Sequence, residues 1–89
     1  MKWLEIIELR TVNTDQNSIQ HQIVEWMDEI KDLKTYHIYT NVRIDTDMSI
    51  HLIHESEQLD LHGSVFGGQL KEMLREWGLV SHSVWIEKL

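Results

Sequence analysis

The strongest constraint on the fold is the alternation of side chains along residues 36–55. On one side of this alternation the residues are mostly apolar, namely Ile38, Thr40, Val42, Ile44, Met48, Ile50 and Leu52. The residues between them are mostly polar, namely Tyr39, Asn41, Arg43, Asp45, Ser49, His51, Ile53 and Glu55. Because successive side chains of a strand point to opposite faces, the pattern predicts a β-hairpin with one buried face, turning at Asp45-Thr46-Asp47.

Stretches typical of strands and helices lie on both sides of this hairpin. Residues 3–12 carry apolar side chains on both alternating faces, and residues 80–87 alternate as a last strand. A helix follows the polar residues 13–17, with Asn17 or Ser18 as its predicted N-cap; its apolar stripe comprises Ile19, Ile23, Trp26, Met27, Ile30 and Leu33. A second helix over residues 64–77 ends before Gly78, a predicted left-handed cap, and its apolar face comprises Phe66, Leu70, Met73, Leu74 and Trp77.

The order of these elements, β-α-β-β-α-β, indicates an α+β class and a ferredoxin-like sandwich formed by residues 1–89 as a single domain. Right-handed crossovers place both helices on one face of a four-stranded antiparallel sheet. The expected strand order is 4-1-3-2, with the first and third strands in the centre. The first strand suits a central position because it is apolar on both faces.

The same alternation predicts the register of the hairpin. Even residues must pair with even residues if Val42 and Ile50 are to share a face, which requires an odd number of loop residues. The simplest solution is a loop of residues 45–47. This register places His51 opposite Asn41 on the polar face, and it places Arg43 opposite Ser49.

The charge of the chain excludes some classes of partner. Eight Lys and Arg residues are scattered among fifteen Asp and Glu residues, and the formal net charge is -7. Without a basic stripe, neither nucleic acid nor an anionic membrane surface is expected as a partner. The chain has no cysteine, which excludes disulfides and thiolate chemistry, and we expect no cofactor.

We expect the protein to be cytoplasmic. The start of the chain, residues 1–5, reaches an acidic side chain before any apolar run develops, unlike a signal peptide. No run in the sequence approaches the ~20 apolar residues that a membrane-spanning helix needs.

The sheet face that the two helices leave uncovered mixes polar and large apolar side chains. Besides residues of the first strand, it is predicted to carry Tyr39, Asn41, Arg43, Ser49, His51, Ile53 and Trp85. Because such an apolar area is unfavourable in water, we expect a homodimer, or a larger oligomer built from it, to bury this face. The alternative is a monomer with a few aromatic side chains on a solvated sheet.

The predicted register gathers Tyr39, Asn41, Arg43 and His51 on that uncovered face. Arginine, histidine and tyrosine around a partly apolar floor are suited to hold a small carboxylate or phenolic ligand. The alternative is that the same four residues make polar contacts across a dimer interface or are solvated.

A glycine-rich segment precedes the second helix. Backbone N–H groups at the start of a helix can bind an anion, which makes His62, Gly63 and Ser64 candidate binding residues. The segment lacks the lysine of a P-loop and the spacing of a dinucleotide-binding motif. The alternative is that its glycines allow close packing or a sharp turn into the helix. Nothing in the sequence orients Ser64 as a nucleophile with His62 as its base.

The remaining histidines predict no metal site. His51 and His54 are three residues apart in a strand, so their side chains point to opposite faces and cannot chelate one ion. His54 is predicted to end the buried face of its strand. His82 falls on the apolar side of the last strand, where we expect a hydrogen-bonded core histidine.

Two segments, residues 44–54 and 78–86, look like small bacterial proteins without an assigned function. Over nearly the whole chain, the pattern of elements also resembles the dimeric α/β-barrel group, which includes the antibiotic-biosynthesis monooxygenase-like proteins. This resemblance implies that two sheets pack into a dimer and that a small aromatic substrate binds between sheet and helices. No active-site residue of that group is matched by a residue of this chain.

Two functions are expected from these observations. The first is a small homo-oligomeric binding module without a catalytic motif. The alternative, implied by the resemblance, is a cofactor-independent monooxygenase-like enzyme acting on a small aromatic substrate. Such an enzyme needs an enclosed cavity of roughly 300 Å³ or more, lined by titratable groups.

Overall fold

The computed structural model describes residues 1–12, 15–29 and 35–89. The chain has the α+β class expected from the sequence. Its elements are β1 (Lys2–Thr11), α1 (Gln16–Asp28), β2 (Thr35–Thr40), β3 (Asp47–Glu55), α2 (Val65–Leu74) and β4 (Gly78–Ile86).

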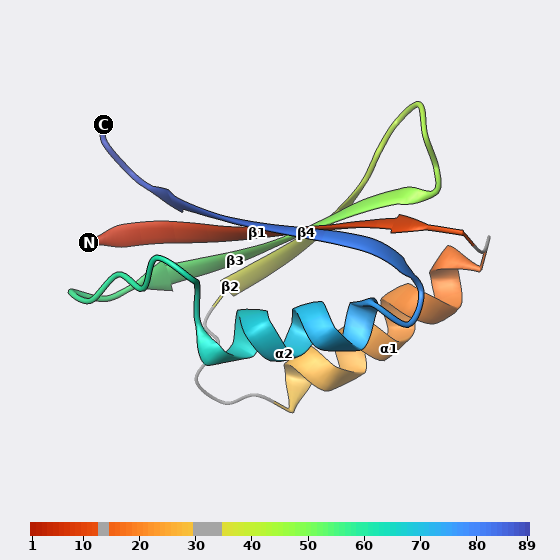
Figure 1. The fold of residues 1–89 in the computed structure, drawn as a ribbon, viewed down its shortest axis with the longest axis horizontal. Coiled ribbons are helices and arrows are strands. Elements are labelled where there is room, and N and C mark those ends of the chain that lie inside the picture. Colours follow the sequence, from red (N-terminus) through yellow and green to blue (C-terminus); the bar gives the residue numbers. More distant parts are fainter. Residues whose placement is uncertain (13–14, 30–34) are drawn as a thin grey trace.

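The four strands form one antiparallel sheet in the order β2-β3-β1-β4. A sheet has no inherent direction, so this is the order 4-1-3-2 counted from the β4 edge, with β1 and β3 in the centre. Both helices lie on the same side of the sheet (Figure 1). We call the side next to the helices the covered face and the other side the open face.

The core lies between the covered face and the helices. The odd residues of β1 point toward the helices, and Ile7 and Leu9 among them are buried. Ile50, which pairs with Ile7, and Leu52 are buried beside them on β3. Each such side chain contributes roughly 1.5–3 kcal/mol when it leaves water. The helices complete this core with Ile19, Ile23, Met27, Leu70 and Leu74.

Both helices begin at a side chain that caps the backbone. Asp15 accepts a hydrogen bond from the amide of Ser18 at 3.2 Å and caps α1. The predicted cap at Asn17 or Ser18 is therefore wrong, because Asp, Asn and Ser are all preferred caps and composition does not choose between neighbouring candidates. Ser64 caps α2 by accepting a hydrogen bond from the amide of Gly67 at 3.0 Å.

The predicted apolar stripe of α1 is confirmed where the structure describes it. Ile19, Ile23 and Met27 are buried, and Trp26 packs against the core. The predicted stripe residues at positions 30 and 33 lie outside the described residues.

The C-terminal end of α2 differs from the prediction. The helix ends at Leu74 rather than at residue 77. Gly78 is not left-handed, since Gly63 is the only described glycine with a positive φ. Gly78 instead begins β4 opposite Thr11, where a Cβ would overlap the carbonyl oxygen of Arg10. This glycine therefore permits the close approach of β4 to β1 and does not cap the helix.

The β2–β3 hairpin keeps the predicted parity but not the predicted loop. Ile38 pairs with Ile50, so even residues face even residues, as expected. The strands are joined by residues 41–46 rather than by residues 45–47. The register is consequently shifted, and the predicted pairs of His51 with Asn41 and of Ser49 with Arg43 are wrong. The observed partner of His51 is His37, and that of Ser49 is Tyr39.

The longer loop has a local cause. The side-chain oxygen of Asn41 accepts hydrogen bonds from the amides of Arg43 at 2.8 Å and Ile44 at 3.0 Å, which turns the chain out of the strand. Val42 and Ile44, predicted on the buried face, are 98% and 47% exposed. The apolar alternation continues into this loop, so periodicity alone did not show where β2 ends.

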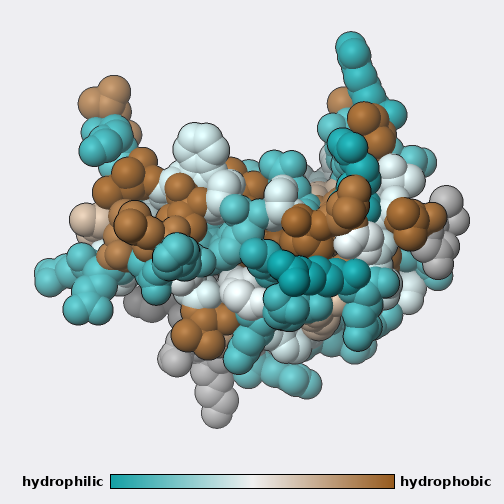
Figure 2. Space-filling view, viewed as in Figure 1, coloured by the Kyte–Doolittle hydropathy of each residue, from teal (hydrophilic) through white to brown (hydrophobic). Residues whose placement is uncertain are grey.

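The loop of residues 41–46 rises from the open face, away from the helices (Figure 1). The C-terminal end of the chain rises on the same side at the other end of the sheet. The surface dips between these two projections (Figure 2). The open face is therefore concave along the direction of the strands.

The corrected register can be tested with one substitution made at two positions. Ile50 is fully buried, so we expect Ile50→Ala to lower the free energy of unfolding by about 3 kcal/mol. Ile44 lies in the exposed loop, so the same change there should cost less than about 1 kcal/mol. Equal losses in guanidinium denaturation would contradict the observed register and support the shorter predicted loop.

Candidate functional site

Four successive rows of side chains cross the open face from β4 through β1 and β3 to β2, and a further row of Lys2 and Glu55 lies beyond them at one end of the sheet. The register gives the rows Trp85, Leu4, Ile53 and Thr35; Ser83, Ile6, His51 and His37; Ser81, Glu8, Ser49 and Tyr39; and Leu79, Arg10 and Asp47. The row of Trp85, Leu4 and Ile53 is largely apolar, and the rows of Glu8 and of Arg10 carry charged groups; Lys2 and Glu55, both exposed, lie beyond the apolar row. We call the row of Trp85, Leu4 and Ile53 the apolar end of the open face, and the rows of Glu8 and of Arg10 its polar end.

The apolar end exposes large side chains. Trp85 is 57% exposed, and its indole N–H donates a hydrogen bond to the hydroxyl of Ser83 at 2.9 Å, which orients the ring along β4. Leu4 and Ile53, in the same row, are only partly buried. Because the helices lie on the other side of the sheet, these three residues form an apolar strip that faces solvent.

Two of the predicted site residues meet in the middle of the open face. The rings of Tyr39 and His51 are 4.6 Å apart, and His37 lies opposite His51 on the next strand. Partial burial and, to a smaller extent, His37 lower the pKa of His51, whereas Glu8 opposes this shift. His51 is therefore favoured in its neutral form.

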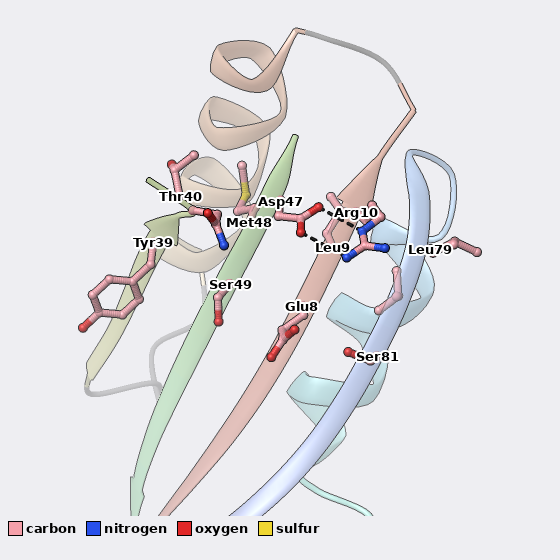
Figure 3. Close-up of a pocket in the computed structure, with 12 residues that line it drawn as sticks. Glu8, Leu9, Arg10, Tyr39, Thr40, Asp47, Met48, Ser49, Leu79 and Ser81 are labelled. Atoms are coloured by element: carbon pink, nitrogen blue, oxygen red, sulfur yellow. Dashed lines mark hydrogen bonds and ion pairs between the residues drawn. The ribbon is translucent and has the colours of Figure 1, made fainter. Parts of the chain in front are cut away.

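A hollow of about 370 Å³ opens at the polar end (Figure 3). Glu8 lies in the middle of it on β1, between its two cross-strand neighbours Ser49 and Ser81. The small serine side chains on both sides of Glu8 account for the hollow. Tyr39 on β2 and Leu79 on β4 border it on the two sides.

An ion pair between Arg10 and Asp47 lies in the outer row of the polar end. The Nε of Arg10 lies 3.1 Å from Oδ1 of Asp47, and its Nη2 lies 3.3 Å from Oδ2 (Figure 3). The hydrogen bond and the charge of Asp47 raise the pKa of Arg10. Since Asp47 balances the charge of Arg10, the carboxylate of Glu8 gives the lining of the hollow a net negative charge.

The four predicted ligand-binding residues are only partly gathered by the fold. Tyr39 and His51 lie side by side on the open face. Asn41 lines the hollow from the start of the loop, and Arg43 is exposed on the raised part of that loop. The basic residue that borders the hollow is Arg10.

Comparison with protein-family models, with curated proteins and with solved structures finds no match to this chain. Within residues 1–12, 15–29 and 35–89, no helix is long and apolar enough to cross a bilayer. In the same part of the chain, no group of three or more His, Asp or Glu side chains is arranged to hold a metal ion.

A second polar cluster lies on the covered face beneath the start of α2. Glu5 is fully buried, and its carboxylate lies 2.6 Å from Nε2 of His54 and 2.7 Å from Nε2 of His82. It also accepts a hydrogen bond from the amide of Ser64 at 3.0 Å. Each of the two carboxylate oxygens thus has one imidazole nitrogen within hydrogen-bonding distance. The three partners come from β3, β4 and the cap of α2, so one side chain connects four elements.

Neighbouring side chains hold His54 in place. The ring of Trp3 stacks on His54 with a centroid separation of 4.1 Å and an angle of 22°. The indole N–H of Trp3 donates a hydrogen bond to the hydroxyl of Ser56 at 3.0 Å. The imidazole of His54 is thus fixed by stacking as well as by its bond to Glu5.

Two of the glycines near the start of α2, Gly63 and Gly67, leave room for the carboxylate of Glu5. A Cβ at Gly63 or at Gly67 would overlap a carboxylate oxygen of Glu5, whereas a Cβ at Gly68 would enter open space. Gly63 also has a φ of 89°, which a residue with a side chain rarely adopts. The start of α2 therefore sits against Glu5, and the helix dipole favours the negative charge there.

Of the predicted anion-binding residues, only two contribute to this arrangement. Ser64 donates its amide to Glu5, and Gly63 turns the chain into α2. His62 is exposed on the surface. The anion that the described structure places at this helix start is a side chain of the protein.

Glu5 was not predicted from the sequence as a site residue, although the alternation along β1 contains a signal for it. Glu5 alternates with Trp3 and Ile7 on the buried face of β1. His54 and His82 were both assigned to apolar faces of their strands. Joining the three residues requires the register of β1 with β3 and β4, which side-chain alternation does not supply.

Adjacent glycines provide a matched test of the packing around Glu5. We expect Gly67→Ala to lower the free energy of unfolding by about 2 kcal/mol, because its Cβ would displace the Glu5 carboxylate. Gly68→Ala has room and should stabilise α2 by up to about 1 kcal/mol. In a Glu5→Ala background, Gly67→Ala should lower the free energy of unfolding by clearly less than in the natural chain. Additive losses in urea denaturation would show that the two sites do not touch.

The lowered pKa of His51 predicts a pH dependence. His51 binds a proton less readily in the folded chain than in the unfolded chain, because its pKa is lowered by folding. The free energy of unfolding should therefore decrease as the pH falls from the ordinary pKa of 6.5 through the lowered pKa of His51. We expect His37→Gln to raise the pKa of His51, measured by NMR titration of the ring protons. His21→Gln, on α1, should leave it unchanged. A His51 pKa unaffected by His37→Gln would contradict this assignment.

Proposed function

We propose that the chain is a homodimeric binding module with a ferredoxin-like fold, which pairs through the apolar end of its open face and holds a small ligand at the polar end. The observation that carries this proposal is the division of the open face. Trp85, Leu4 and Ile53 lie at one end, and the hollow around Glu8 lies at the other.

The apolar end supports pairing with a second copy. A strip formed by Trp85, Leu4 and Ile53 is self-complementary, because a two-fold axis brings the same strip of each copy together. Tryptophan is also among the residues that contribute most to binding energy at interfaces.

The position of the hollow supports a binding module over the monooxygenase-like alternative. The resemblance implies a substrate between sheet and helices, but Ile7, Ile50 and Leu70 in that layer have no exposed surface. The hollow lies instead on the open face, where the ligand is held by strand residues. Its lining includes Glu8 but no pair of titratable groups in hydrogen-bonding contact other than the Arg10–Asp47 ion pair, within the described residues.

Light scattering after size exclusion tests the pairing. We expect the natural chain to have twice the mass of one 10.6 kDa chain. Trp85→Ser should shift this equilibrium toward the monomer, since it removes the largest side chain of the apolar strip. Leu61→Ser is the matched control, because Leu61 is 80% exposed but lies in the segment between β3 and α2. A monomeric natural chain, or equal effects of both changes, would refute pairing through this face.

A further inference from the structure

We infer that the hollow at the polar end of the open face binds a small organic amine, whose protonated nitrogen pairs with Glu8. This inference names the ligand class of the proposed binding module and rests on that proposed function. It follows from the charge, the hydrogen-bonding groups and the shape of the hollow.

The charge of the hollow favours a cation. Glu8 is exposed at the middle of the open face, and the nearest guanidinium, that of Arg10, is engaged by both carboxylate oxygens of Asp47. His51, in the next row, is held toward its neutral form by burial and by His37. The charge of Glu8 acts on Arg10 and His51, but among the described residues neither forms an ion pair with it, and an ammonium group would supply that partner.

The hydrogen-bonding groups also fit an ammonium. A primary ammonium has three N–H donors. The Glu8 carboxylate and the hydroxyls of Ser49 and Ser81 beside it are three acceptor groups in one row of the sheet. The hydroxyl of Ser81 is not engaged by another described side chain, and that of Ser49 lies 3.1 Å from Nε2 of His51. A hydroxyl has two lone pairs, so Ser49 can keep this contact and still accept from a ligand.

The shape of the hollow fits an amine with an apolar or aromatic tail. Its volume of about 370 Å³ is within the range of small-molecule sites. Tyr39, which is 50% exposed, and Leu79 border it from the two edge strands. A tail lying against either side chain would bury apolar surface while the nitrogen stays at Glu8.

The same features disfavour the small carboxylate expected from the sequence. That expectation placed Arg43 on the strand facing Ser49, but Arg43 lies in the loop and Tyr39 takes its place. A ligand carboxylate would meet Glu8 and Asp47 in the hollow, with Arg10 already paired. The hollow should therefore prefer a positively charged ligand over a negatively charged one.

Three ligands that share a phenyl ring and differ in their polar group test this preference. Phenethylamine, 2-phenylethanol and 3-phenylpropionate are titrated into the full chain at low salt and followed by ¹⁵N NMR. We expect the amine to bind about tenfold or more tightly than the other two and to shift the amides of Glu8, Ser49 and Ser81. Equal or tighter binding of 3-phenylpropionate, shifts at other residues, or no binding of the amine would overturn the inference.

A charge-matched pair of variants locates the site. Glu8→Gln should remove the preference for the amine, whereas Glu25→Gln, an exposed acidic residue on α1, removes the same net charge and should leave the preference intact. Because Glu8 is exposed, its variant is expected to fold, which the dispersion of the same NMR spectrum checks. Loss of preference in both variants would show a general charge effect and overturn the role of Glu8.

The outcome for the ligand is separable from the outcome for the dimer. The amine titration is repeated on Trp85→Ser, and the mass of each sample is measured. Amine binding by a monomer supports the site and refutes the pairing. A dimer that binds 3-phenylpropionate in the hollow keeps the proposed module and overturns the amine as its ligand class.

Discussion

One buried carboxylate connects the strands of the sheet to the start of α2. Removing an ionised group from water costs several kcal/mol unless it finds partners inside the protein. Glu5 finds them in His54, His82 and the amide of Ser64, which belong to β3, β4 and the cap of α2. Apolar packing alone would let α2 slide over the sheet, since hydrophobic attraction has no direction. The hydrogen bonds to Glu5 have direction, so they fix where the helix starts and how close it lies.

This internal attachment gives the two faces of the sheet separate roles. The odd residues of β1 hold the helices, and its even residues, from Leu4 to Arg10, belong to the open face. Charged residues on β1 therefore have opposite surroundings: Glu5 is enclosed by hydrogen-bond donors, while Glu8, three residues further along the same strand, faces solvent between two serines. The buried contacts of β1 lie on one side of the strand, and its exposed side chains lie on the other.

Much of the architecture was predictable, because it follows from local periodicity. Alternation and chain handedness predict the order of elements and the central position of β1 and β3. They also predict that even residues of β2 pair with even residues of β3, as Ile38 does with Ile50. What failed depended on single hydrogen bonds or contacts. Asn41 ends β2 by binding two amides of its own loop, and Gly78 is required by the backbone of Arg10. The Glu5 cluster joins residues from three strands, so it becomes visible only when their register is known.

The distance along the chain between Glu5 and His82 has a consequence for synthesis. The two residues are separated by 77 positions, and β4 is synthesised after the other five described elements. Until then the central strand lacks one of its two neighbours, and the buried acid lacks one of its imidazoles. A nascent chain can form the β1–β3 pair and still hold an incomplete interior. The four-stranded sheet therefore becomes complete only when β4 pairs with β1.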